Sequence, residues 1–168
     1  DALMMYRHSQ EGLVRGVSTN ANYDASSFHF EAQKVPTFGE NTEADWLSFL
    51  FDHGTPKPHW QNYIQGAVTF ACGKFGREII NGFNFVIESN IPAGGGASSS
   101  SALVVLGGAA IRDANRISFT PEELARDSAM AEWFIGTRGG SMDHITICLA
   151  QPASVVLINY SNSQTRRV

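Results

Sequence analysis

The sequence is short of cysteine, of positive charge and of long apolar runs. Its 168 residues include two cysteines, Cys72 and Cys148, and neither has a partner at metal-ligand spacing, so no disulfide framework is expected. The formal net charge of −4 at pH 7 provides no cationic field to hold nucleic acid or an anionic membrane. No apolar run approaches the roughly 20 residues that a bilayer span needs, and the opening residues lack a signal-peptide pattern. These absences favour a soluble, cytoplasmic enzyme or binding domain.

The composition is that of a folded domain. With 43% apolar and 17% charged residues, the chain is long enough to form one domain with a sizeable core, and neither disorder nor collagen-like repetition fits. The chain starts at Asp1 inside a strand-like segment, and the pair Arg166-Arg167, expected to be a solvated strand end, follows another without a closing element. We therefore expect a fragment or a processed chain.

Hydrophobic periodicity predicts a mixture of strands and helices without strict alternation, which favours an α+β fold. The helix over 102–114 is apolar on almost every face and is expected to run through the middle of the domain. Thr120, Pro121 and Glu123 form a helix start with a capping box. The expected strands are 2–7, 13–19, 28–32, 83–88 and 154–160, and the expected helices are 42–51, 60–75, 102–114, 120–135 and a short one that contains 142–149.

A glycine–serine segment lies between the strand 83–88 and the buried helix. Three glycines at 94–96 let backbone amides approach a ligand, and the four serines at 98–101 can cap or donate at the start of the helix. With the positive end of the helix dipole, this arrangement predicts an anion site, most naturally for phosphate. A flexible linker is the alternative, equal on composition alone, but linkers rarely run straight into so apolar a helix. The segment matches neither a Walker loop nor a dinucleotide fingerprint.

The segment 92–100 resembles the phosphate-binding second motif of the GHMP small-molecule kinases, and its Pro-x-Gly-Gly-Gly form looks most like that of galactokinases. Ala97 stands where leucine is usual and Ser101 where alanine is usual, and both small residues should keep the loop open. The resemblance implies that ATP is bound by Pro92, Gly94, Gly95, Gly96, Ser98, Ser99 and Ser100.

The run from Gly140 to Asp143 resembles the galactokinase Gly-x-Met-Asp segment. The resemblance implies that Asp143 is the general base at the anomeric hydroxyl of the sugar, and that Gly140 and Asp143 bind the substrate. Judged without the resemblance, a lone Asp at this place simply caps its helix. His144 stands where the family mostly has Gln, which bears on substrate choice, and it is expected either to support a site residue or to lie at the surface.

A metal site is implied by the resemblance of Ala131-Glu132-Trp133 to the family's Ala-Glu-His. The family's glutamate helps to hold Mg²⁺ with a serine of the phosphate loop, and counting along the motif gives Ser100, with Ser99 as its nearest rival. Mg²⁺ takes few protein oxygens beside those of phosphate, so one Glu and one Ser suffice. The alternative places Glu132 on a solvated helix face.

An adenine site is implied by residues 60–66, which resemble the galactokinase Trp-x-Asn-Tyr-x-x-Gly segment. Trp60 and Tyr63 would then flank the purine, as aromatic rings can. The alternative, equally compatible with the residues, has Tyr63 in the core and Trp60 at a helix start.

Taken together, the resemblance covers residues 2–160 and implies a GHMP kinase N-terminal domain, with the ribosomal protein S5 domain 2-like fold and helices on one face of a mixed sheet. The implied reaction transfers the γ-phosphoryl of MgATP to the anomeric hydroxyl of galactose, giving galactose 1-phosphate and ADP. Alternatives are a kinase for N-acetylgalactosamine, arabinose or a heptose, a non-catalytic sensor of galactose and ATP, and a plain interaction domain. The oligomeric state is not predicted.

Two family segments are not matched within 1–168: an upstream one with an arginine and most sugar ligands, and a downstream glycine-rich motif with the C-terminal domain. We therefore expect the chain to be an incomplete ATP-binding domain, which binds its ligands weakly and does not turn over alone.

Overall fold

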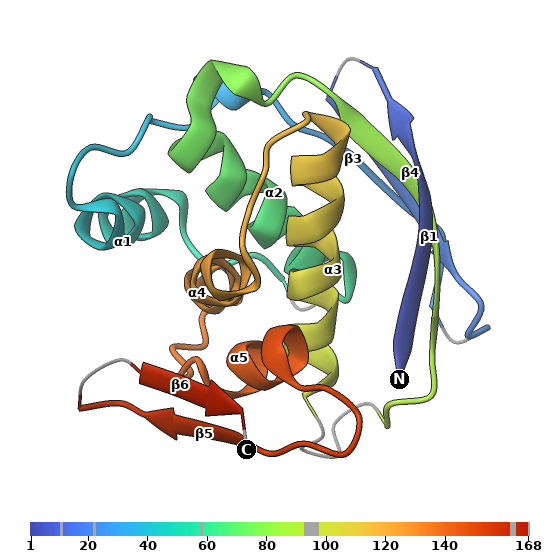
Figure 1. Ribbon diagram of the computed structural model, residues 1–168. Helices are drawn as coiled ribbons and strands as arrows, with labels where there is room; N and C mark the ends of the chain where they lie inside the picture. The colour runs from blue at the N-terminus through green and yellow to red at the C-terminus, as the bar shows by residue number, and fades with distance from the viewer. Residues whose placement is uncertain (11, 22, 58, 93–97, 162–163, 168) are drawn as a thin grey trace.

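A computed structural model describes residues 1–10, 12–21, 23–57, 59–92, 98–161 and 164–167. It confirms the α+β fold, with a four-stranded mixed sheet that carries the helices on one face (Figure 1). The strands are β1 (Ala2–Ser9), β2 (Leu13–Ser18), β3 (Ser26–His29) and β4 (Gly82–Ser89), in the order β1-β4-β2-β3. Strand β4 runs antiparallel to β1 and parallel to β2, and β3 is antiparallel to β2.

The sheet follows the alternation predicted for its central strand. In β4, Phe83, Phe85 and Ile87 are buried toward the helices, whereas Val86 is exposed on the open face. On β2, a Cβ added at Gly16 would lie 2.1 Å from Cζ of Phe85, so the aromatic ring needs a glycine at this position. Alternating burial of this kind is what fixes the register of a half-buried strand.

The helices are α1 (Thr42–His53), α2 (Gln61–Phe75), α3 (Ser99–Ala114), α4 (Pro121–Ala131) and α5 (Met142–Leu149), with 3-10 turns η1 (Ala32–Lys34), η2 (Gly76–Glu78) and η3 (Glu132–Ile135). As predicted, α3 is central: it contacts α2, α4, α5, β1 and β4. A Cβ at Gly107 of α3 would lie 3.2 Å from Cα of Ile64, so this glycine lets α2 approach closely. That approach brings the start of α2 near the start of α3.

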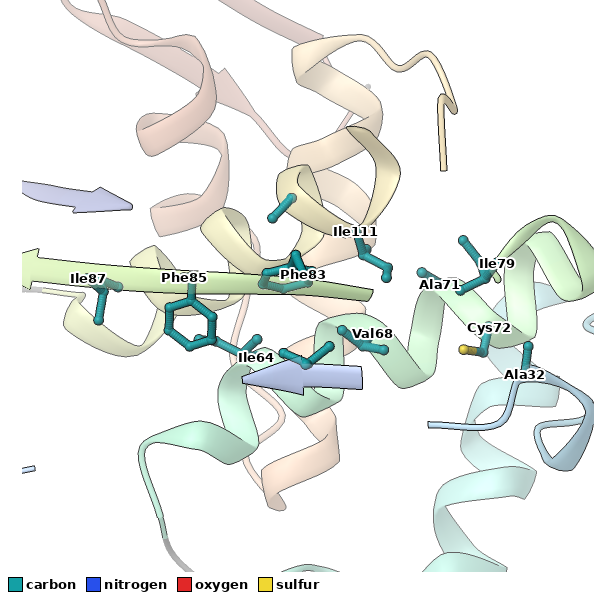
Figure 2. Close-up of a cluster of buried hydrophobic side chains, with 12 residues drawn as sticks. Ala32, Ile64, Val68, Ala71, Cys72, Ile79, Phe83, Phe85, Ile87 and Ile111 are labelled. Atoms are coloured by element: carbon teal, nitrogen blue, oxygen red, sulfur yellow. The ribbon is translucent and has the colours of Figure 1, made fainter. Parts of the chain in front are cut away.

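Two apolar clusters hold these layers together. Figure 2 shows the first, between the sheet and the helices α2 and α3, with Ile64, Phe83 and Ile111 at its centre. The second surrounds the fully buried Trp46 of α1, whose indole N–H donates to the carbonyl of Met130 at 2.7 Å. Each large apolar side chain so buried contributes about 1.5–3 kcal/mol. The second cluster fixes α1 and η3 against α2.

Several boundaries differ from the sequence-based predictions. The predicted strand 28–32 lies at Ser26–His29 instead, and Ala32 begins the 3-10 turn η1. The predicted helix 120–135 is divided into α4 and η3, although its capping box and its end at Gly136 (φ 89°) are confirmed. The predicted strand 154–160 was expected to be followed by no further element. It is instead shortened to β5 (Val156–Asn159), which forms a separate hairpin with β6 (Gln164–Arg167).

The two cysteines are free thiols that are buried to different extents. Cys72 is fully buried, and burial raises the pKa of its thiol to about 12; burial also raises the pKa of half-buried Cys148 to about 11. Neither thiol is therefore reactive near neutral pH. In the described part of the chain, no helix combines the length and the apolar character needed to cross a membrane.

Candidate active site

A cavity of about 350 Å³ opens at the N-terminal end of α3. It brings together four residues that the sequence assigned to a nucleotide, Trp60 and Tyr63 from the start of α2 and Ser99 and Ser100 from α3. The volume lies within the range of small-molecule sites. Its complete lining is Ala2, Ser18, Asn20, Tyr23, His59, Trp60, Tyr63, Ile87, Ser89, Ile91, Ser99, Ser100 and Leu103.

The start of α3 has an unusual backbone. Its N-cap, Ser98, adopts the left-handed conformation (φ 59°, ψ 32°), and its side chain makes no capping hydrogen bond. Such conformations in residues other than glycine cost about 1–3 kcal/mol and concentrate at functional sites. Ser98 lies at the positive end of the dipole of a 16-residue helix. Gly94, Gly95 and Gly96 lie outside the described residues, and Pro92 and Ser98 do not line the cavity.

The aromatic wall of the cavity contains an unsatisfied donor. Nε1 of Trp60 is buried and has no hydrogen-bond partner in the part of the chain that the structure describes. The indole packs against Tyr23 and Phe85, with ring centroids 6.2 and 6.1 Å away. An unpaired buried donor costs about 1–3 kcal/mol. Trp60 is also the N-cap of α2, as the alternative interpretation of this residue expected.

Tyr63 lies between the cavity and the apolar core. It lines the cavity and also packs against the cluster around Trp46. Burial raises the pKa of its phenol, and the nearby negative charge of Glu132 raises it further. The phenol therefore stays protonated and remains a hydrogen-bond donor at neutral pH.

Glu132 lies among donors from two other elements. The hydroxyl of Ser101 on α3 donates to its Oε2 at 3.0 Å, and Nε2 of His144 on α5 lies 2.8 Å from the same oxygen. The side chain is only 15% exposed, so the alternative of a solvated helix face is wrong. Burial favours the neutral acid, but the contacts with His144, Ser100 and Ser101 outweigh it and hold the pKa of Glu132 below its usual value. The carboxylate therefore stays ionised.

The oxygens around Glu132 suit a magnesium ion that phosphate helps to hold. Ser100 contributes to the lowered pKa of Glu132, so the two ligands that the resemblance implies lie near each other. Within the described residues, no group of three or more His, Cys, Asp or Glu could hold a metal by itself. Mg²⁺ is commonly bound by one or two carboxylates together with substrate phosphates and water, so this donor set fits that ion.

Asp143 lies in the first turn of α5. The N-cap of that helix is Ser141, so the alternative in which Asp143 caps its own helix is wrong. Its carboxylate is half-buried and makes no hydrogen bond or ion pair with another described residue. Helices α3 and α5 lie against each other (Figure 1), and the chain of contacts from Ser101 through Glu132 to His144 joins their first turns.

Gly140 lies at a second cavity. Together with Gly139 and Ser141 it lines this cavity of about 570 Å³, bounded by α4, α5 and the β5–β6 hairpin. Asp143 lines neither of the two cavities. The structure of this chain therefore does not bring the two proposed substrate-binding residues into one hollow.

Sequence reasoning did not assign several residues that the structure places here. Ser18, Tyr23 and His59 line the first cavity and come from three segments that carry no binding motif. Ser101 and His144 contact Glu132, and both had a signal in the sequence, since each departs from the motif that its segment resembles.

The model of the GHMP kinases N terminal domain matches residues 62–151. A galactokinase of Lactobacillus helveticus is 30% identical over 132 residues, which is 76% of this chain and 34% of that protein. A galactokinase of Dictyostelium discoideum is 36% identical over 108 residues, 62% of this chain and 21% of that protein. The chain spans about a third or less of the length of these relatives.

Solved structures show the same fold. Lactococcus lactis galactokinase complexed with galactose gives a TM-score of 0.78 at 21% identity, covering 99% of this chain and 38% of that chain. A D-glycero-D-manno-heptose 1-phosphate kinase from Bacteriodes thetaiotaomicron gives a TM-score of 0.63 at 17% identity, covering 99% of this chain and 47% of that chain. The match of the family model over more than half of the residues, together with this shared fold, identifies the chain as a member of the GHMP kinase family, within its N-terminal domain.

Proposed function

We propose that the chain is the ATP-binding part of a sugar kinase that transfers the γ-phosphoryl of MgATP to the anomeric hydroxyl of galactose, forming galactose 1-phosphate and ADP. The observation that carries this proposal is the cavity at the start of α3, where Trp60, Tyr63, Ser99 and Ser100 meet. The similarity to galactokinases supports the choice of sugar and of reaction.

In this proposal the nucleotide lies along the cavity, toward the start of α3. The purine packs against Trp60 and Tyr63, which line the cavity. The phosphates reach the first turn of α3 and the glycines 94–96. The dipole of α3 and the backbone amides of these residues favour negative charge. Phosphoryl transfer depends mainly on positioning and charge neutralisation, which these groups supply.

Glu132 and Ser100 would hold Mg²⁺, and the bound ion would neutralise charge on the β- and γ-phosphates. Asp143 accepts the proton of the anomeric hydroxyl as the oxygen attacks, and Gly140 contributes to the sugar site. The arginine and the remaining sugar contacts are supplied by the part of the kinase that residues 1–168 do not contain.

Substituting Trp60 tests the nucleotide site. We expect Trp60→Ala, in the full-length protein that contains this chain, to weaken ADP binding about tenfold, because stacking of a base on an aromatic ring contributes about 1–3 kcal/mol. Isothermal titration calorimetry measures the dissociation constant. The control is Phe51→Ala on α1, an aromatic that is 89% exposed and distant from the cavity lining, which should leave the constant within about twofold. Unchanged ADP affinity in the Trp60 variant would place the nucleotide elsewhere.

A further inference from the structure

Three elements of the fold meet at one oxygen atom. Oε2 of Glu132 in η3 accepts from Ser101 of α3 at 3.0 Å and lies 2.8 Å from Nε2 of His144 in α5. His144 is 2% exposed, so its imidazole is fixed in the interior and does not sample solvent. Neither of these two contacts engages Oε1, the second oxygen of the carboxylate.

The contact between Nε2 of His144 and Oε2 of Glu132 is short but poorly aligned for a hydrogen bond. The distance is that of an ion pair, whereas neither ring nitrogen of His144 forms an aligned hydrogen bond within the described residues. A buried ionised carboxylate needs compensating donors or charge, and the imidazole can supply them at Oε2. Neither Glu132 nor His144 lines the cavity at the start of α3, so His144 contacts Glu132 outside the lining of the nucleotide site.

We propose that His144 is a positioning residue, which anchors Oε2 of Glu132 and thereby presents Oε1 to the magnesium ion of the bound nucleotide. This inference rests on the proposed role of Glu132 as a magnesium ligand. Groups that orient a ligating side chain from outside the metal sphere typically change metal affinity by about 10–100-fold when they are removed. His144 would thus act on the metal through Glu132, without touching the nucleotide or the sugar.

The test compares ADP binding with and without magnesium in the full-length protein. Dissociation constants are measured by calorimetry in excess Mg²⁺ and in EDTA. His144→Leu, which has no donor, is expected to weaken MgADP binding at least about tenfold and to leave metal-free ADP binding within about twofold. His144→Gln, whose amide can donate to Oε2, is expected to stay within about threefold of wild type in both conditions. Thr146→Ala is the matched control on α5, because Thr146 is exposed and its hydroxyl bonds only to Met142 of its own helix.

Each result decides the question. Equal weakening of ADP binding in Mg²⁺ and in EDTA by His144→Leu would make the residue merely structural and overturn the proposal, as would unchanged binding in both. Glu132→Gln distinguishes the metal role of Glu132 from the positioning role of His144. If that variant keeps the magnesium-dependent gain in ADP affinity, the proposed metal role of Glu132 fails. If Glu132→Gln abolishes the gain and His144→Leu does not, only the positioning role fails.

A second measurement needs no variant at His144 and covers the case in which the leucine variant does not fold. The ¹⁵N chemical shifts of the His144 ring in the wild-type protein report which nitrogen carries hydrogen. The proposal requires hydrogen on Nε2, the atom that faces Glu132. A bare Nε2 with hydrogen on Nδ1 alone would overturn it.

Discussion

Replacing Asp143 with Asn in the full-length protein is expected to lower kcat by about 10²–10⁴-fold, the usual contribution of a general base. The amide keeps the shape of the carboxylate but cannot accept the proton of the anomeric hydroxyl. Because Asp143 does not line the cavity at the start of α3, ADP affinity should stay within about twofold. Steady-state ADP release and calorimetric ADP binding measure the two quantities separately.

The control for this prediction is Asp52→Asn, which makes the same chemical change at an exposed position near the end of α1. It should turn over at the wild-type rate. Near-normal kcat in the Asp143 variant would remove Asp143 from the role of base. Loss of ADP binding together with kcat would instead indicate damage to the fold of α5.

The largest expected effect on stability comes from Asp127→Asn. The buried Asp127 accepts from Nη2 of Arg112 and, through the same oxygen, from Nζ of Lys74 at 2.6 Å. Burial lowers the pKa of Arg112, and the charge of Asp127 opposes that shift. Removing the carboxylate charge leaves the guanidinium buried without compensation, which typically costs about 3–5 kcal/mol.

Urea unfolding monitored by circular dichroism gives the free energy of unfolding of each variant. Lys74→Met is the comparison, because Lys74 is 31% exposed and its loss leaves the pair of Arg112 and Asp127 intact. We expect it to cost at most about 1 kcal/mol. If Asp127→Asn cost no more than Lys74→Met, the buried pair would contribute little to stability.

Features determined by neighbouring residues were predictable from the sequence. The alternation of Phe83, Phe85 and Ile87 depends on the strand period alone, and the capping box of Thr120 and Glu123 on one helical turn. The predicted strand 28–32 was wrong in both bounds, because β3 (Ser26–His29) is delimited by its pairing with β2, which no pattern within the segment indicates.

Features determined by tertiary packing were not predictable. The network of Lys74, Arg112 and Asp127 joins three helices, and nothing near any one of these residues marks the other two. In the site, the meeting of Trp60 with Ser100 requires α2 and α3 to pack closely. The sequence marked His144 as unusual, but its contact with Glu132 follows only from the packing of α5 against η3 and α3.

The most direct test of the account measures sugar-dependent ADP formation by the full-length protein with MgATP. Galactose, N-acetylgalactosamine, arabinose and a heptose are compared by kcat/KM. The account predicts that galactose gives the highest value and that galactose 1-phosphate accumulates in step with ADP. Preference for another of these sugars would contradict the proposed substrate, and ADP formation that no sugar stimulates, in a protein that binds ATP, would contradict the kinase itself.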